Sequence, residues 1–196
     1  MTSPPPNARV TLVRHGQSTW NERGLIQGQN DDAVLTTQGE REALFVAETL
    51  KSVGFTHIIS SDLRRARETA AIIATVLELE VSEDSRLRER CFGSLESQPL
   101  RLLDPASSGI TNGVLLDPDA RTEGGESFRD LVNRAGSFLD DTLDLWADSR
   151  LLVATHGGTI RALHAYVQDS PLEGLSMVGV GNCSVWDLIP VPTPGA

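Results

Sequence analysis

The stretch TLVRHGQSTWN, residues 11–21, decides the fold. It opens with an apolar run typical of a buried β-strand, and the run ends on Arg14 and His15, with Gly16 next. Two side chains that are costly to bury therefore end a buried strand. Ligands of parallel α/β sheets bind beyond the carboxyl ends of the strands. The stretch therefore predicts a ligand site at that edge of a sheet.

A second strand ends in the same way. The segment VATHGG, residues 153–158, places His156 and Gly157 after an apolar run. One such histidine alone is more simply interpreted as a buried core residue with satisfied hydrogen bonds. Two strand-ending His-Gly pairs favour a shared site instead. Gly16 and Gly157 are expected to let the backbone approach a ligand closely.

Hydrophobic periodicity predicts alternating strands and helices along the chain. Strands are expected at residues 9–13, 57–60, 151–155 and 183–189, with another short one before residue 85. Helices are expected at residues 36–53, 62–79, 126–147 and 159–167, with Ser61 or Asp62 capping the second of them. The alternation predicts an α/β fold, a three-layer α/β/α sandwich with a mostly parallel sheet covered on both faces.

The length of 196 residues fits one domain. We expect that domain at residues 9–189, after a disordered leader at 1–8 and before a flexible tail at 190–196. Residues 97–124 are rich in proline and glycine, which predicts an insertion or lid over one end of the sheet. Leu115 and Leu116 in this segment are candidates for an apolar substrate wall, or for packing.

Composition excludes several partners. The net charge of −10 without any long basic run argues against nucleic acid and against an anionic membrane surface. No stretch reaches the ~20 apolar residues that span a bilayer. With two distant cysteines and no secretion signal, a reduced cytoplasmic protein is expected. The basic residues are sixteen arginines and Lys51, so a phosphate site must rely mainly on arginine, although codon bias explains the skew.

Two further segments carry charged side chains near the ends of strands. ISSDLRRARETA, residues 59–70, places three arginines near the start of a helix, where backbone N–H groups favour an anion. Arg64 is best interpreted as part of a solvated face, whereas Arg65 or Arg67 is a candidate phosphate ligand. SRLRERCFGSLE, residues 85–96, holds Glu89 among arginines, where a surface ion pair is the simplest interpretation of that residue alone.

Several catalytic motifs are missing from the sequence. It contains no G-x-S-x-G elbow, no G-x-x-x-x-G-K-[ST] loop, no H-E-x-x-H and no C-x-x-C. A serine hydrolase of that type and a P-loop NTPase are therefore excluded. Neither a metal nor a cofactor is expected.

In this order, RHGQSTWN, IQGQND (26–31), LTTQGEREA (35–43), SSDLRRARETA, RLRE and THGG resemble the histidine phosphatase superfamily, also called phosphoglycerate-mutase-like. The resemblance runs from Arg9 to about Leu188 and implies the phosphoglycerate-mutase-like version of the α/β/α sandwich. One departure is LES at residues 95–97, where many members have W-E-G. Ser97 then occupies a position that glycine usually fills.

The resemblance implies roles for individual residues. His15 would be the nucleophile that forms a phosphohistidine. Arg14, Arg65 and His156 would surround the transferring phosphoryl group, and Glu89 would be the proton donor. The residues matching positions that line the substrate phosphate are Asn21, Gln27, Gly28 and, in some phosphatases, Arg67.

Two further expectations concern the phosphate site. Gly16 is expected to keep the backbone clear of the phosphate. The surrounding cations should lower the pKa of His15, which keeps its ring neutral and nucleophilic.

The same family contains phosphatases and mutases. Mutases of phosphoglycerate are longer, carry an Arg pair after the acid and usually have Asn after His-Gly. This chain has only Arg101 and Arg121 in residues 97–124, and HGG at 156–158. We therefore favour a metal-independent phosphatase of a small phosphomonoester, of the sugar or alcohol phosphate type. A 2,3-bisphosphoglycerate-dependent phosphoglycerate mutase is the alternative.

A non-enzymatic phosphate-binding module is disfavoured because His15, His156 and Glu89 are all present. The expected partner is a small-molecule phosphomonoester. The sequence does not decide the oligomeric state, and a homodimer stays open.

Overall fold

The computed structural model describes residues 9–142 and 149–188. Its strands are β1 (Arg9–Arg14), β2 (His57–Ser60), β3 (Val81–Glu83), β4 (Ile110–Thr111), β5 (Val114–Leu115), β6 (Arg150–Thr155) and β7 (Val185–Leu188). Its helices are α1 (Thr19–Glu22), α2 (Thr37–Leu50), α3 (Arg64–Leu77), α4 (Pro105–Ser108), α5 (Phe128–Thr142) and α6 (Gly157–Val167). Short 3₁₀ turns lie at Ser85–Leu87, Gly93–Leu95 and Leu100–Leu102.

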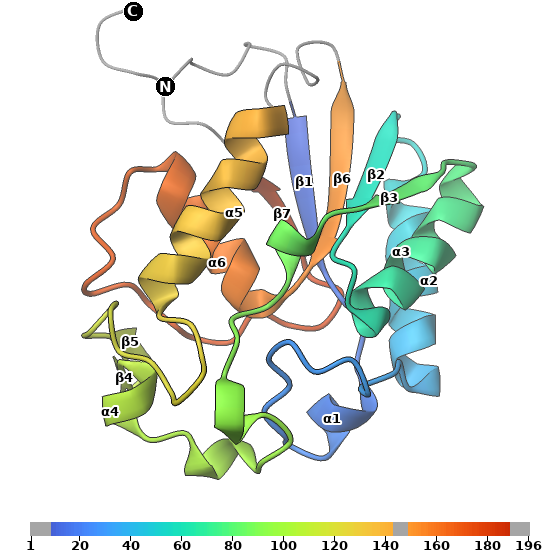
Figure 1. The fold of residues 1–196 in the computed structure, drawn as a ribbon. Coiled ribbons are helices and arrows are strands. Elements are labelled where there is room, and N and C mark those ends of the chain that lie inside the picture. Colours follow the sequence, from blue (N-terminus) through green and yellow to red (C-terminus); the bar gives the residue numbers. More distant parts are fainter. Residues whose placement is uncertain (1–8, 143–148, 189–196) are drawn as a thin grey trace, which may run out of the picture.

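The central sheet has the strand order β3-β2-β6-β1-β7 (Figure 1). The strands β3, β2, β6 and β1 run parallel, and β7 closes the edge antiparallel to β1. In this register, Arg14 at the end of β1 lies beside Thr155 at the end of β6. The residues that follow these two strands therefore enter the same edge of the sheet.

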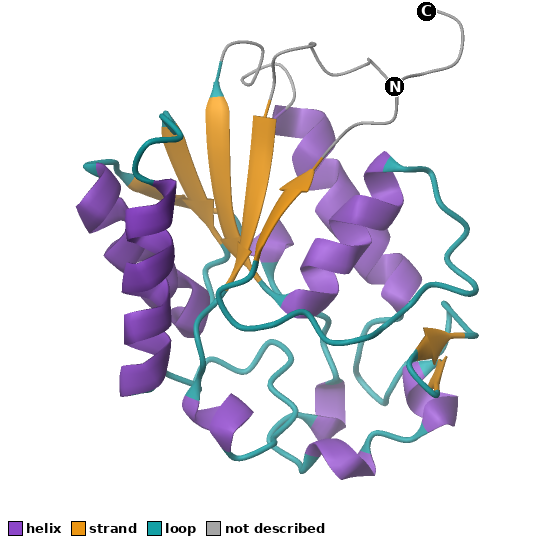
Figure 2. Ribbon diagram, turned by 180° about the vertical axis from the view of Figure 1, so that it is seen from behind, coloured by secondary structure: helices purple, strands orange, loops and turns teal. Residues whose placement is uncertain are grey.

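Helices cover both faces of the sheet, as Figure 2 shows. Alternate residues of β1 and β6 point to opposite sides. Leu12 and Val153 join a core with α5 and α6, whereas Val13 and Leu152 join a core with α2 and α3. The predicted α/β/α sandwich with a mostly parallel sheet is confirmed. The central strands β1 and β6 are mostly apolar because both of their faces are buried.

The expected helices and strands match in place, with shifts at their ends. In α2 the buried face consists of Ala43, Val46, Ala47 and Leu50 at helical spacing. The helix α6 begins at Gly157, two residues earlier than predicted, so both glycines lie in its first turn. Residues 143–147 of the third expected helix, the leader at 1–8 and the tail at 190–196 lie outside the described residues.

The predicted cap of the second helix is wrong. Leu63 is the N-cap residue of α3 and makes no side-chain capping bond. The carboxylate of Asp31, from the loop after α1, instead accepts a hydrogen bond from the backbone N–H of Arg64. A distant acid here supplies the charge that a helix N-terminus favours, and it ties that loop to α3.

The segment at residues 97–124 folds against the loop at residues 24–28. Ile26 donates its N–H to the carbonyl of Gln98 at 2.9 Å, and Ser97 donates to the carbonyl of Ile26 at 2.8 Å. In Figure 1 this part of the chain lies with α1 beyond the lower ends of the strands. Leu115 is completely buried in the core with α5, while Leu116 is 52 % exposed. Leu115 is therefore a packing residue.

None of the helices within the described ranges combines the length and apolar character that crossing a bilayer requires.

Candidate active site

The two strand-ending histidines meet at the edge of the sheet. His15 donates its backbone N–H to the carbonyl of Thr155 at 2.9 Å, which fixes the loop after β1 beside the end of β6. The ring centroids of His15 and His156 lie 5.2 Å apart. Both side chains are buried, at 2 % and 0 % exposure. The parallel pairing of β1 and β6 thus brings together residues 141 positions apart in the sequence.

His15 is held in a defined tautomer. Its Nδ1 lies 2.8 Å from the carbonyl oxygen of Gly16. A carbonyl oxygen only accepts hydrogen bonds, so Nδ1 carries the proton and the neutral ring has its lone pair on Nε2. Burial, followed by the nearby charges of Arg65 and Arg14, holds the pKa of His15 well below its usual value. The result is a neutral imidazole whose Nε2 carries the lone pair.

Arg65 is the most deeply buried cation of the site, at 1 % exposure. Its Nη1 donates to the carbonyl of Asn30 at 3.0 Å, and its Nη2 donates to the carbonyl of Gly28 at 2.7 Å. Burial lowers the pKa of its guanidinium to about 10, so Arg65 stays charged at neutral pH. The carbonyl of Gly28 that accepts from Arg65 Nη2 belongs to a residue with a φ of 51°. This left-handed conformation favours glycine.

Three buried nitrogen atoms near His15 have no hydrogen-bond partner within residues 9–142 and 149–188: Arg14 Nε, Arg65 Nε and His156 Nδ1. Arg14 donates through Nη1 to the carbonyl of Val180, and His156 Nε2 lies 2.9 Å from Ser61 Oγ. Burial lowers the pKa of Arg14, and burial followed by the charge of Arg65 lowers that of His156. Buried polar groups are normally paired, so this cluster is suited to an anion with several acceptor oxygens.

Glu89 lies at the same edge and is fixed by two backbone donors. Gly158, in the first turn of α6, donates its N–H to Oε2 at 3.0 Å. Arg90 donates its N–H to Oε1 at 2.8 Å. Burial lowers the pKa values of Arg14 and Arg65, and the negative charge of Glu89 opposes this effect by raising them. A carboxyl group therefore faces the same cluster that two arginines and two histidines form.

The helix α1 and the loop that follows it supply amide groups. Asn21 Oδ1 accepts from the backbone N–H and from Oγ of Ser18, both at 3.1 Å. Ser18 Oγ also lies 2.7 Å from Oε1 of Gln27. Asn21 and Gln27 are thus linked through the buried Ser18, and Gln27 lies on the loop that carries the carbonyl partners of Arg65.

The surroundings of Gly16 give a packing reason for a residue without a side chain at this position. A Cβ on Gly16 would collide with the backbone carbonyl of Gly39, in the first turn of α2. Gly16 is therefore required for close packing of the loop against α2. A Cβ on Gly157 would lie 3.7 Å from Arg14 Nε, so this glycine does face the cluster.

Arg67 is not drawn into the buried cluster. Its side chain is 43 % exposed, and its Nη2 lies 3.7 Å from Asp31 Oδ2. Arg64 is more exposed, at 53 %, and pairs with Glu68 four residues further along α3. The prediction that Arg64 belongs to a solvated face is therefore confirmed.

Several supporting residues lie outside the patterns that predict the site. Thr69 Oγ1 accepts from the N–H of Gly16 at 3.0 Å and donates to the carbonyl of Arg65 at 2.8 Å. Asn182 Nδ2 donates to the carbonyl of His15 at 3.1 Å and to Asn21 Oδ1 at 3.2 Å. Ser61 and Thr69 were visible within SSDLRRARETA as polar residues in an apolar setting, whereas Asn182 lies in a loop without any pattern.

No group of three or more His, Cys, Asp or Glu side chains within the described ranges is placed to hold a metal ion. The donors that converge at the site are nitrogen atoms of cationic or neutral side chains. Such a set fits an anion.

Comparison with known proteins agrees with this geometry. Residues 10–190 match the family model of the histidine phosphatase superfamily (branch 1). A probable phosphoglycerate mutase GpmB of Salmonella paratyphi B is 39% identical over 181 residues, which cover 90% of this chain and 82% of the relative. The chain therefore belongs to the histidine phosphatase superfamily.

Solved structures of the same fold include phosphatases. A mycobacterial glucosyl-3-phosphoglycerate phosphatase is 29% identical, with a TM-score of 0.79 over 92% of this chain and 90% of that one. YhfR of Bacillus stearothermophilus is also 29% identical, with a TM-score of 0.81 over 91% of this chain and 89% of that one. Membership of this superfamily makes the chain a phosphoryl-transfer enzyme of the histidine phosphatase class.

Proposed function

We propose that the chain is a metal-independent phosphatase that hydrolyses a small phosphomonoester through a phosphohistidine on His15. The observation that carries the proposal is the buried cluster, in which a neutral His15 lies near nitrogens of Arg14, Arg65 and His156 that find no hydrogen-bond partner among the described residues. A neutral nucleophile surrounded by fixed cations suits attack on a phosphate dianion.

In the first step, Nε2 of His15 attacks phosphorus, and the bond from phosphorus to the ester oxygen breaks. Arg14 and Arg65 balance the charge on the phosphoryl oxygens. In this mechanism Ser61 Oγ donates a hydrogen bond to Nε2 of His156, so the neutral ring carries its proton on Nδ1. That N–H donates to the same phosphoryl group. Glu89, in its protonated form, gives its proton to the departing oxygen, so that an alcohol leaves.

In the second step, water replaces the alcohol. The Glu89 carboxylate takes a proton from that water while its oxygen attacks phosphorus. The bond from phosphorus to Nε2 breaks, inorganic phosphate leaves, and His15 returns as a neutral ring. One carboxyl group thus serves as acid and then as base.

Two observations support hydrolysis over mutase activity. Arg121 pairs with Asp130 at 3.3 Å, and Arg101 lies on an exposed turn, so the two arginines form no adjacent pair. A Cβ at position 158 would collide with Glu89 Oε1, so the observed carboxylate position requires the second glycine of HGG. The mutase remains the second candidate because the relative of 39% identity is named a probable phosphoglycerate mutase.

The substrate class follows from the modest charge of the segment at residues 97–124. Few basic side chains lie there, so we propose a sugar or alcohol phosphate of low charge rather than a polyphosphate. A cytoplasmic location, and action on a small molecule without nucleic acid or membrane partners, are proposed on the composition alone. A homodimer is left open.

The test incubates the protein and its His15→Ala variant with 3-phosphoglycerate plus 2,3-bisphosphoglycerate, and separately with a panel of sugar and alcohol phosphates. Release of inorganic phosphate from a panel member, lost in the variant and without isomerisation, is the expected result. Rapid formation of 2-phosphoglycerate with little phosphate release would instead establish the mutase.

A further inference from the structure

The segment that carries Glu89 is held by side chains to which the proposed chemistry gives no role. Residues 86–91 contain no helix or strand beyond one 3₁₀ turn at their start. Backbone hydrogen bonds of regular structure therefore do not fix the position of Glu89. Its placement depends on donors from other elements.

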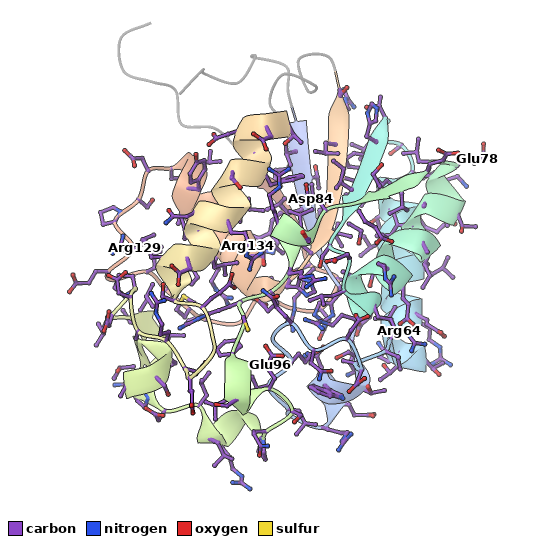
Figure 3. All side chains as sticks on the ribbon, viewed as in Figure 1. Arg64, Glu78, Asp84, Glu96, Arg129 and Arg134 are labelled. Carbon is purple, nitrogen blue, oxygen red and sulfur yellow. The ribbon has the colours of Figure 1, made fainter. Side chains whose placement is uncertain are left out.

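Arg134 of α5 supplies the largest share of these donors. Its Nη1 donates to the carbonyl of Arg86 at 2.7 Å and to that of Arg88 at 3.0 Å. Its Nη2 donates to the carbonyl of Glu89 at 3.2 Å. Figure 3 shows Arg134 between α5 and the segment that follows β3. One guanidinium thus spans three carbonyls of the segment.

Glu126 completes the arrangement from the loop before α5. Its Oε1 accepts from Arg134 Nε and its Oε2 from Arg134 Nη2, both at 2.8 Å. The same Oε2 accepts the backbone N–H of Cys91 at 3.0 Å. The carboxylate therefore orients the guanidinium of Arg134 and also fixes the backbone of Cys91, two residues after Glu89.

Gln29 links this pair to the phosphate side of the site. Its Nε2 donates to the carbonyl of Glu89 at 3.2 Å and lies 3.4 Å from Glu126 Oε2. The loop of Gln29 also provides the carbonyls of Gly28 and Asn30 to Arg65. The segment of Glu89 and the loop at residues 28–30 are thereby fixed against each other.

The ion pair of Arg134 and Glu126 is largely shielded from solvent. The side chains of Arg134 and Glu126 are 21% and 22% exposed, unlike a solvated surface pair, which contributes little. A planar guanidinium forms the two parallel bonds to a carboxylate and still reaches carbonyls, and lysine cannot reproduce this pattern.

From these contacts we propose that Arg134 and Glu126 are positioning residues for Glu89: they hold its carboxyl group where it protonates the leaving oxygen. The inference rests on the proposed function. A purely structural clamp would lower stability without changing which leaving groups the enzyme accepts. A positioning role predicts a selective loss with leaving groups that need a proton.

The test compares phenyl phosphate, whose leaving oxygen needs protonation, with p-nitrophenyl phosphate, whose leaving group departs readily as an anion. Rapid-quench mass spectrometry measures the rate of phosphohistidine formation on His15. For Arg134→Lys and Glu126→Gln we expect the rate with phenyl phosphate to fall about tenfold or more, as a misplaced acid predicts. The rate with p-nitrophenyl phosphate should change by no more than about twofold. Glu126→Gln decides the matter should Arg134→Lys fail to fold.

Arg129→Lys is the matched control, because Arg129 lies on the same helix and pairs with exposed Asp119 at 2.7 Å. In Figure 3 it lies at the outer edge of α5. Both of its rates should match the wild type. In a Glu89→Gln background, Arg134→Lys should cause no further loss with phenyl phosphate, because the acid through which it acts is gone.

The outcomes separate the inference from the proposed function. Equal losses with both compounds, or an additive loss in the Glu89→Gln background, would overturn the positioning role while leaving the phosphatase intact. A wild-type protein that forms no phosphohistidine with either compound would overturn the proposed function and this inference with it.

Discussion

The backbone N–H of Gly158 donates a hydrogen bond of 3.0 Å to Oε2 of Glu89. This bond joins the first turn of α6 to the segment after β3, and so links the strand end that carries His156 to the acid. A Cβ at position 158 would collide with Oε1 of the same carboxylate. The second glycine of HGG is therefore a requirement of the site.

Gly158→Ala is expected to displace the carboxyl group of Glu89 while leaving the fold intact, since the colliding atom is the end of a flexible side chain. Loss of a well-placed general acid lowers the rate by about 10² or more. Steady-state kinetics on a substrate with a poor leaving group measures the loss. Gly179→Ala, where a Cβ meets open space, is the control. Equal activity of both variants would contradict the assignment.

The sequence predicted the strands, the main helices and the sheet edge well, because buried elements impose periodicity on their residues. The apolar runs of β1 and β6 and the stripe of α2 follow directly from burial on one face or two. The His-Gly pairs at the strand ends also indicated the candidate site from the sequence alone.

Contacts between polar residues far apart in the chain left no such pattern. Asp31 caps α3 from the loop after α1, and Gly16 is needed because Gly39 packs against it. Both relationships are contacts between segments that lie far apart in the sequence and meet only in the folded chain. The pair of Arg134 and Glu126 left no pattern either, since each alone is an ordinary charged residue, one on α5 and the other in the loop before it.

Arg65→Lys is expected to weaken both phosphate binding and stability. A lysine ammonium cannot reach the carbonyls of Gly28 and Asn30 together in the geometry of a guanidinium fork. Leaving buried acceptors unsatisfied costs about 1–3 kcal/mol. Thermal unfolding with and without inorganic phosphate measures both effects, because a ligand of the native state raises Tm. Arg64→Lys, on the exposed face of α3, should retain the wild-type increase in Tm. An equal increase for Arg65→Lys would refute the role.

Ser97→Gly is expected to stabilise the protein. Ser97 has a φ of 71°, in the left-handed region that a side chain disfavours. Relief of this strain is worth about 1–2 kcal/mol, against which the greater freedom of glycine in the unfolded chain costs about 0.4–1 kcal/mol. Urea denaturation of Ser97→Gly should show a higher midpoint than that of the wild type. The control Ser94→Gly should show no increase, because Ser94 is not in the left-handed region. A lower midpoint for Ser97→Gly would contradict the strain.

Stability should fall as the pH falls below about 6.5, the ordinary pKa of histidine. Burial and nearby arginines lower the pKa values of His15 and His156 in the folded state. Between the folded and unfolded pKa values the unfolded chain binds more protons, so acid favours unfolding, by up to about 1.4 kcal/mol per pH unit for each histidine.

The measurement is the free energy of unfolding of the wild type and of a His15→Gln/His156→Gln variant at pH 7.5, 6.5 and 5.5. The difference between their slopes isolates the two histidines from the carboxyl groups. A shallower slope is expected for the variant, and identical slopes would show that the pKa values are not lowered.

Trapping the phosphoenzyme tests the central claim most directly. The protein is mixed with p-nitrophenyl phosphate, quenched at alkaline pH within milliseconds, digested and analysed by mass spectrometry. A phosphoryl group on the peptide that contains His15, absent in His15→Ala and accumulating in Glu89→Gln when hydrolysis of the intermediate is slowed, is the predicted result. Phosphate release without any phosphohistidine on His15, or phosphate release that persists in His15→Ala, would contradict the mechanism.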